Sequence, residues 1–136
     1  MNLYLVRHGE TQANYDGVYC GSSDIPLTQQ GRWQAQHVAW QLAEVPFDRI
    51  AASGLRRTHE TARILRPDQA PECSPQWNEM AFGEWELRHH HDLRRNDPAR
   101  YGAWCDDWRH AVLPRRGRLS GFFAPGHRRH RAPHRR

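Results

Sequence analysis

Arg7 and His8 stand side by side where the apolar run of residues 3–6 ends. A second arginine, Arg57, follows another short apolar stretch, and Glu79 adds a carboxylate further along the chain. Two guanidinium groups hold an oxyanion by forked hydrogen bonds, and a neutral imidazole is a nucleophile. A carboxylic acid can protonate a leaving alkoxide and then take a proton from water. In one pocket, these four side chains would suit phosphoryl transfer through a phosphohistidine, with no metal or cofactor.

The pattern around these residues predicts an α/β fold with a parallel sheet. Short apolar stretches predict buried strands, and apolar residues at helical spacing predict helices. We expect strands at residues 3–6, 48–52 and 73–77, helices from Thr28 to Pro46 and over residues 55–65, and a loop at residues 9–26. This alternation predicts right-handed βαβ units, whose parallel strands are covered by helices.

The predicted topology brings the reactive residues to one edge of the sheet. Ligands of such sheets bind beyond the carboxyl ends of the strands. His8 follows the first predicted strand and Ser53 follows the second, so both belong to this edge. Arg57 also lies in the first turn of its predicted helix, where backbone N–H groups and the helix dipole favour an anion.

Four segments resemble, in order, the motifs of the histidine phosphatase superfamily, which has the three-layer phosphoglycerate-mutase-like fold. They are VRHGET, CGSSDIPLTQQGRWQA, SGLRRTHETA and WNEMAFGEWE, at residues 6–11, 20–35, 53–62 and 77–86. The resemblance implies that His8 is the nucleophile and that Arg7 and Arg57 bind phosphate. It also implies that Glu79 is the proton donor and that Asn14 contacts phosphate.

Neighbouring residues leave alternatives open at two of these positions. Arg56 precedes Arg57, and Glu84 and Glu86 are carboxylates close to Glu79. Ser53 is a further candidate for contact with phosphate.

Residues 79–114 resemble a narrower group of that family, the α-ribazole phosphatases of enterobacteria. This resemblance implies that the substrate is α-ribazole 5′-phosphate or adenosylcobalamin 5′-phosphate, in cobalamin biosynthesis. A mutase or a sugar-phosphate phosphatase would share every catalytic residue named. Within this segment, residues 88–112 predict a helical hairpin broken near Pro98, with Trp104 and Trp108 packed in a lid.

The resemblance stops at about residue 113, and the family's second half is not recognisable after it. That half should contain an apolar strand followed by a second active-site histidine and a glycine, and no such segment occurs. We therefore expect residues 1–113 to be the N-terminal part of the phosphatase domain. We also expect the chain to be less stable than intact relatives and to aggregate. An inactive truncated product of the same ancestry is the alternative.

The last 23 residues differ sharply in composition from the rest. The chain has no lysine, and eight of its 20 arginines lie in residues 114–136, which contain no acid. The other 12 arginines and all 15 acids lie in residues 1–113, whose formal charge is −3. We predict that the tail is disordered and read in a shifted frame. Weak binding of nucleic acid through the tail is an alternative function, but no specific nucleic-acid partner is expected.

Three histidines in a row, His89, His90 and His91, raise the question of a metal site, with His110 and Cys105 as further ligands. Adjacent residues of a helix point about 100° apart, which makes them poor joint ligands for zinc. The sequence therefore predicts no metal.

Cysteine usage and hydropathy favour a cytoplasmic protein. Cys20, Cys73 and Cys105 are widely spaced and form no CxxC motif, which indicates free thiols in a reducing compartment. No apolar run approaches membrane-spanning length, and the N-terminal run is too short for a signal peptide. A small phosphate monoester is the expected partner, with no membrane, and the oligomeric state is left open.

Overall fold

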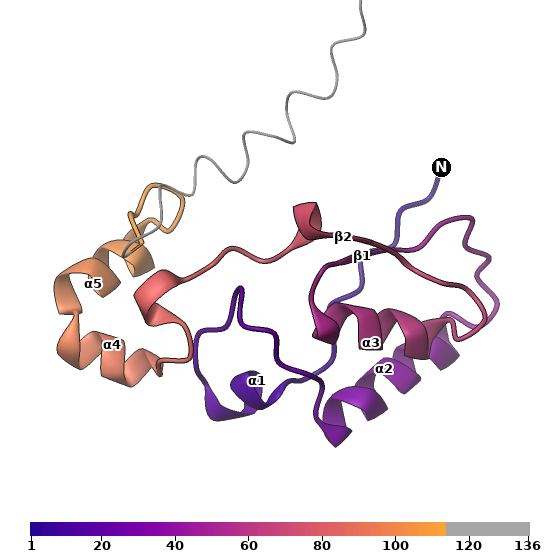
Figure 1. Cartoon of the computed structure of the whole chain (residues 1–136), viewed down its shortest axis with the longest axis horizontal. Helices are drawn as coiled ribbons and strands as arrows, with labels where there is room; N and C mark the ends of the chain where they lie inside the picture. Colours follow the sequence, from indigo (N-terminus) through magenta and orange to yellow (C-terminus); the bar gives the residue numbers. More distant parts are fainter. Residues whose placement is uncertain (114–136) are drawn as a thin grey trace, which may run out of the picture.

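The computed structural model describes residues 1–113. Figure 1 shows the strands with helices α2 and α3 at one end, helices α4 and α5 at the other, and α1 between them. The elements are, in order, α1 (Gln12–Asp16), α2 (Gln29–Gln41), β1 (Ala51–Ser53), α3 (Arg56–Leu65), β2 (Glu72–Ser74), the 3-10 helices η1 (Pro75–Trp77) and η2 (Gly83–Trp85), α4 (His90–Asn96) and α5 (Pro98–Asp106). The predictions made for the tail, residues 114–136, fall outside the described residues.

Strands β1 and β2 form a parallel pair, with Ala52 opposite Cys73. Helix α3 connects the two strands and lies between them and α2 (Figure 1). Small buried residues, Ala35 and Ala39 on α2 and Ala62 on α3, let the two helices approach closely. The predicted α/β class and the parallel pairing are therefore confirmed.

The predicted first strand is wrong for the described residues. Residues 3–6 have no secondary structure, and the exposed fractions of Leu3 and Leu5 are 76% and 88%. A buried strand needs a partner backbone beside it and side chains over its faces. No strand among residues 1–113 pairs with this segment. Apolar composition alone predicted the strand, but it could not supply the partner.

Helix α1 forms inside the segment predicted as loop, and a capping box explains it. Thr11 Oγ1 accepts a hydrogen bond from the Asn14 N–H (3.2 Å), and Asn14 Oδ1 accepts one from the Thr11 N–H (2.9 Å). The two residues thereby satisfy donors that a helix start leaves unpaired. Gly17 ends the helix at a φ of 69°, a conformation that glycine adopts without strain.

The backbone that follows His8 is held tightly between two helices. The Gly9 N–H donates to Thr61 Oγ1 of α3 (3.1 Å). A Cβ at Gly9 would lie 2.3 Å from the carbonyl oxygen of Gly31, in the first turn of α2, so only glycine fits. Thr28 caps α2 as predicted, and its Oγ1 accepts the Gly31 N–H at 3.0 Å.

Helices α4 and α5 form the predicted helical hairpin, with the break at Asp97 and Pro98. They enclose an aromatic cluster, in which the Trp85 indole N–H donates to Asp97 Oδ2 (3.1 Å). The cluster consists of Phe82, Trp85, Leu93, Tyr101 and Leu113, with Tyr19, Met80 and Trp104 packed against it. No helix among residues 1–113 has the length and apolarity needed to cross a bilayer.

Candidate active site

A pocket of about 220 Å³ lies at the carboxyl end of β1, beside the first turn of α3. His8 enters it from the segment before α1, and Glu79 enters it from the segment after η1. The lining residues are His8, Ser53, Arg57, Thr58, Trp77, Asn78 and Glu79. The structure thus brings together three of the four side chains that the sequence singled out.

The His8 ring is half-buried and held in one orientation by the backbone. Its Nδ1 lies 2.7 Å from the Gly9 carbonyl oxygen. Because a carbonyl only accepts, Nδ1 carries the proton, and the lone pair of the neutral ring lies on Nε2. Burial, the largest influence, lowers the pKa of His8, and the charges of Arg57 and Arg7 lower it further, while the Gly9 carbonyl and Glu79 act in the opposite direction. His8 is therefore a neutral imidazole with Nε2 available as nucleophile at pH 7.

Arg57 is buried, with 3% of its surface exposed, and its guanidinium is held by neutral groups. It donates to the carbonyl oxygens of Gly21 (2.8 Å) and Ser23 (3.1 Å), and its Nη1 lies 3.7 Å from Cys20 Sγ. No carboxylate of residues 1–113 forms an ion pair with it. A positive charge without a paired acid in the wall of a pocket favours binding of an anion.

The neighbouring arginine has a different environment. Arg56 is exposed, does not line the pocket, and its Nη2 lies 3.9 Å from Glu60 Oε1. Of the two arginines, the geometry favours Arg57 as the phosphate ligand.

Among the three candidate carboxylates, Glu79 alone lines the pocket. Its Oε1 accepts the Met80 N–H at 3.0 Å, and the side chain remains exposed to solvent. An exposed carboxyl beside the nucleophile can exchange protons with both a leaving group and water.

Glu86 instead holds two segments of backbone together. Burial raises its pKa, but the hydrogen bonds it accepts outweigh burial and hold the pKa of Glu86 below the usual range. These bonds come from the N–H groups of Phe82 (2.9 Å), Gly21 (3.1 Å) and Ser22 (3.0 Å), and from the Ser23 hydroxyl (2.6 Å). An ionised clamp of this kind is unsuited to donating a proton, and it fixes the loop that also holds Arg57.

The sequence profile of the histidine phosphatase superfamily (branch 1) matches residues 3–122. The chain belongs to this superfamily. It is 50% identical over 114 residues to the adenosylcobalamin/alpha-ribazole phosphatase of Escherichia coli K12, which covers 82% of this chain and 56% of the relative. The protein of the same name from Salmonella typhimurium is 47% identical over the same shares. The chain thus spans about half the length of these curated relatives.

Solved structures of the superfamily match the fold. The alpha-ribazole phosphatase from Shigella flexneri superposes with a TM-score of 0.77 and 43% identity, covering 91% of this chain and 64% of that one. A phosphoglycerate mutase from Thermus thermophilus gives a TM-score of 0.72 and 29% identity, covering 90% and 66%. Relatives with two different activities therefore share this histidine phosphatase fold.

Two predicted phosphate ligands of the superfamily motif do not line the pocket. Arg7 is exposed, although its charge still acts on His8. Asn14 Oδ1 accepts hydrogen bonds from the N–H (2.9 Å) and hydroxyl (3.1 Å) of Thr11, which gives it a capping role in α1. Contact of these two residues with phosphate stays a prediction.

Sequence reasoning missed two residues of the pocket as site residues: Thr58 and Asn78. Thr58 Oγ1 lies 2.6 Å from Ser53 Oγ, and Asn78 Oδ1 accepts the Gly54 N–H at 2.6 Å. Ser53 and Asn78 thus fix the turn between β1 and α3. Thr58 lies within the SGLRRTHETA segment, next to Arg57, which is the signal that could have found it.

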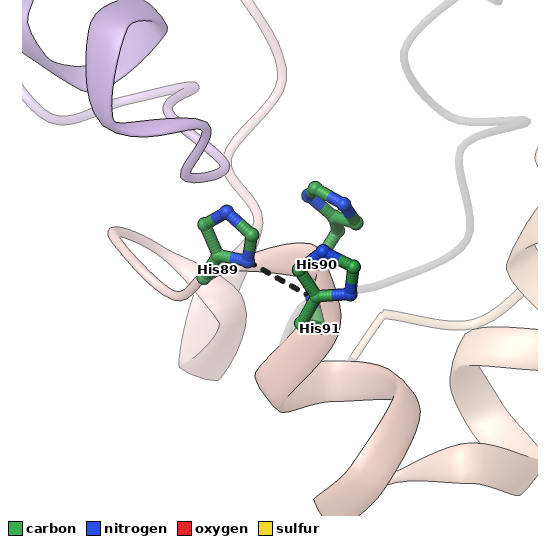
Figure 2. A group of neighbouring side chains, drawn as sticks. All are labelled: His89, His90 and His91. Carbon is green, nitrogen blue, oxygen red and sulfur yellow. Dashed lines mark hydrogen bonds between the residues drawn. The ribbon is translucent and has the colours of Figure 1, made fainter.

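The rings of His89, His90 and His91 do not diverge as helical spacing predicts. His89 lies outside α4, as its N-cap with extended backbone, so the helical spacing of about 100° does not apply to it. The ligand atoms of the three rings lie within 4.8 Å of one another (Figure 2). His110 instead pairs with Asp107 at 2.7 Å.

Proposed function

We propose that this pocket belongs to a phosphomonoesterase in which His8 Nε2 takes the phosphoryl group of a phosphate monoester. The observation that carries the proposal is the neutral His8, with its Nδ1 proton held by the Gly9 carbonyl, in one pocket with Arg57 and Glu79. This set provides a nucleophile, a cation for the phosphate and a carboxyl for the proton.

The reaction proceeds in two steps. In the first, Nε2 attacks phosphorus, the bond to the ester oxygen breaks, and the leaving alkoxide takes the proton of the Glu79 carboxyl. The Gly9 carbonyl stabilises the positive charge that the ring gains while Nδ1 keeps its proton. In the second, water attacks the phosphohistidine, Glu79 takes the water's proton, and His8 and inorganic phosphate are released. Arg57 stabilises the charge on the phosphoryl oxygens in both steps.

The substrate we propose is α-ribazole 5′-phosphate or adenosylcobalamin 5′-phosphate, as the names of the 50% and 47% identical relatives indicate. Trp77 supports a substrate with a flat aromatic base. Its indole lines the pocket with His8 and Glu79 although 68% of its surface is exposed. An exposed indole at the mouth of a phosphate pocket can stack on the base of a nucleotide-like leaving group.

The nucleophile is tested by brief incubation of the purified chain with an aryl phosphate, followed by assay for acid-labile phosphate bound to the protein. We expect labelling of the parent chain and of His37→Ala, whose histidine is exposed on α2, and none of His8→Ala. Labelling that persists in His8→Ala would contradict the assignment.

The substrate is tested by comparing kcat/KM for α-ribazole 5′-phosphate and 3-phosphoglycerate. We expect α-ribazole 5′-phosphate to be preferred, and Trp77→Ala to reduce this preference by raising KM for α-ribazole 5′-phosphate alone. An equal effect of Trp77→Ala on both substrates would contradict stacking on the base.

A further inference from the structure

Three histidine rings gather at the start of α4, away from the phosphate pocket. The ring centroids of His89 and His90 lie 4.2 Å apart, those of His90 and His91 also 4.2 Å, and those of His89 and His91 4.9 Å. Figure 2 shows the three rings on one side of the turn that leads into the helix. None of the three residues lines the pocket of His8.

The backbone explains why the rings stack close together. His89 is the N-cap, and its Nδ1 accepts the His91 N–H at 3.1 Å, which draws the first ring over the start of the helix. His89 is also tied to the turn after α1 by a bridge to Val18. The segment that carries the three rings is therefore anchored on both sides.

The Nδ1 atom of His90 faces a backbone carbonyl. It lies 3.5 Å from the Gly17 carbonyl oxygen, which favours the proton on Nδ1 and leaves the lone pair on Nε2. A ring N–H bonded to a backbone carbonyl is the usual way in which proteins orient a ligating histidine.

His91 is exposed, whereas His89 and His90 are half-buried, so an ion can reach the cluster from solvent. Histidine binds a metal as the neutral imidazole. Because His89 Nδ1 accepts the His91 N–H, a metal bound through this nitrogen would replace that hydrogen bond.

We propose that His89, His90 and His91 form a site for one divalent transition-metal ion of the zinc type. Imidazole nitrogen suits Zn²⁺, Ni²⁺ and Cu²⁺, whereas Mg²⁺ and Ca²⁺ need oxygen ligands, which this cluster does not contain. The ion would bind at the start of α4 and would take water at its remaining positions.

The test is a calorimetric titration of the purified chain with Zn²⁺, with Mg²⁺ as the control ion. The triad variant is H89N/H90Q/H91Q, in which asparagine keeps the cap of α4. The matched control is H127N/H130N/H134N, which removes the same number of histidines from the last ten residues of the sequence.

We expect one Zn²⁺ per chain, no binding of Mg²⁺, and binding weakened at least about 100-fold in the triad variant, since loss of even an indirect contact costs 10–100-fold. The tail variant should retain the parent affinity. The single variant His91→Gln, at an exposed position, should also weaken binding, which guards against misfolding of the triple variant. Parent-like affinity of the triad variant, or loss of binding in the tail variant, would overturn the proposal.

Discussion

The aromatic cluster buries its apolar side chains, whereas the N-terminal segment of residues 3–6 exposes them to solvent. Trp85 and Leu93 are fully buried, whereas Leu3 and Leu5 expose 76% and 88% of their surface. The partners of Trp85 come from residues 19–113, through the helical hairpin and the loop that contains Tyr19. The partners that a strand at residues 3–6 requires do not occur among residues 1–113. Apolar side chains occur in both regions, but they are buried only where other segments of the described chain pack against them.

The candidate active site lies next to the exposed segment of residues 3–6. His8 directly follows the exposed segment, yet its own backbone is held by Gly31 of α2 and Thr61 of α3. Contacts with α2 and α3 therefore hold the backbone beside His8 in place. His8 lines one pocket with Arg57 and Glu79 although residues 3–6 do not pair as a strand.

The largest effect is expected at the centre of the aromatic cluster. Trp85→Ala should reduce the free energy of unfolding by about 3–5 kcal/mol, because it removes a fully buried indole and leaves a cavity. Leu5→Ala, the matched change in the exposed segment, should cost less than about 0.5 kcal/mol. Urea denaturation followed by tryptophan fluorescence and circular dichroism measures both. Equal losses would show that the two regions do not differ in burial.

The two adjacent arginines should differ in their effect on phosphoryl transfer. Arg57→Lys should slow labelling of the protein by about 100-fold, because an ammonium cannot both keep the bonds to the Gly21 and Ser23 carbonyls and hold the phosphoryl oxygens as the planar guanidinium can. Arg56→Lys is the matched control and should label at the parent rate, since Arg56 does not line the pocket. A larger loss in Arg56→Lys would reverse the assignment of the phosphate ligand.

Glu86 should give the protein part of its stability against acid. Its pKa is lower in the folded chain than in the unfolded chain, so its contribution is present above the unfolded pKa and is lost as pH falls through the folded pKa. Glu86→Gln should lose about 1 kcal/mol at pH 7, after allowance for partial exposure to solvent. It should also show a shallower loss of stability below about pH 4.5. Glu44→Gln, at an exposed position, should leave the pH profile of unfolding unchanged.

The smallest effect on stability is expected in the exposed apolar segment of residues 3–6. The double variant L3K/L5K should change the free energy of unfolding by less than about 0.5 kcal/mol. It should nevertheless reduce self-association, since an exposed apolar segment favours contact between chains. Sedimentation velocity at several concentrations measures this, and unchanged association would show that residues 3–6 do not drive it.

The structure brings His8 and Arg57 into one pocket, as the sequence predicted, although the strand expected before His8 does not form. The resemblance to the family motif singled out both residues, and Arg57 lies in the first turn of a helix that the sequence also predicted. The strand at residues 3–6 failed because pairing depends on distant backbone. The clamp formed by Glu86 was not predictable either, because it joins groups 63 to 65 positions apart, on Gly21, Ser22 and Ser23.

Local geometry adds to what the sequence alone shows at two short helices. Asn14 occurs where the family motif has a phosphate contact, which stays a prediction, and its side chain completes a capping box with Thr11. The prediction for the three histidines treats them as residues of one helix, but the helix begins after His89 and the ring nitrogens lie close together. In both places, the exact start of a short helix determines what the side chain does.

The nitrogen of His8 that carries the phosphoryl group tests the central claim most directly. NMR of the labelled chain, with ³¹P and ¹⁵N detection, distinguishes phosphate on Nε2 from phosphate on Nδ1. Because Nδ1 donates its proton to the Gly9 carbonyl at 2.7 Å, the phosphoryl group should be found on Nε2 of His8. Phosphate on Nδ1, or on any residue other than His8, would contradict the proposed mechanism.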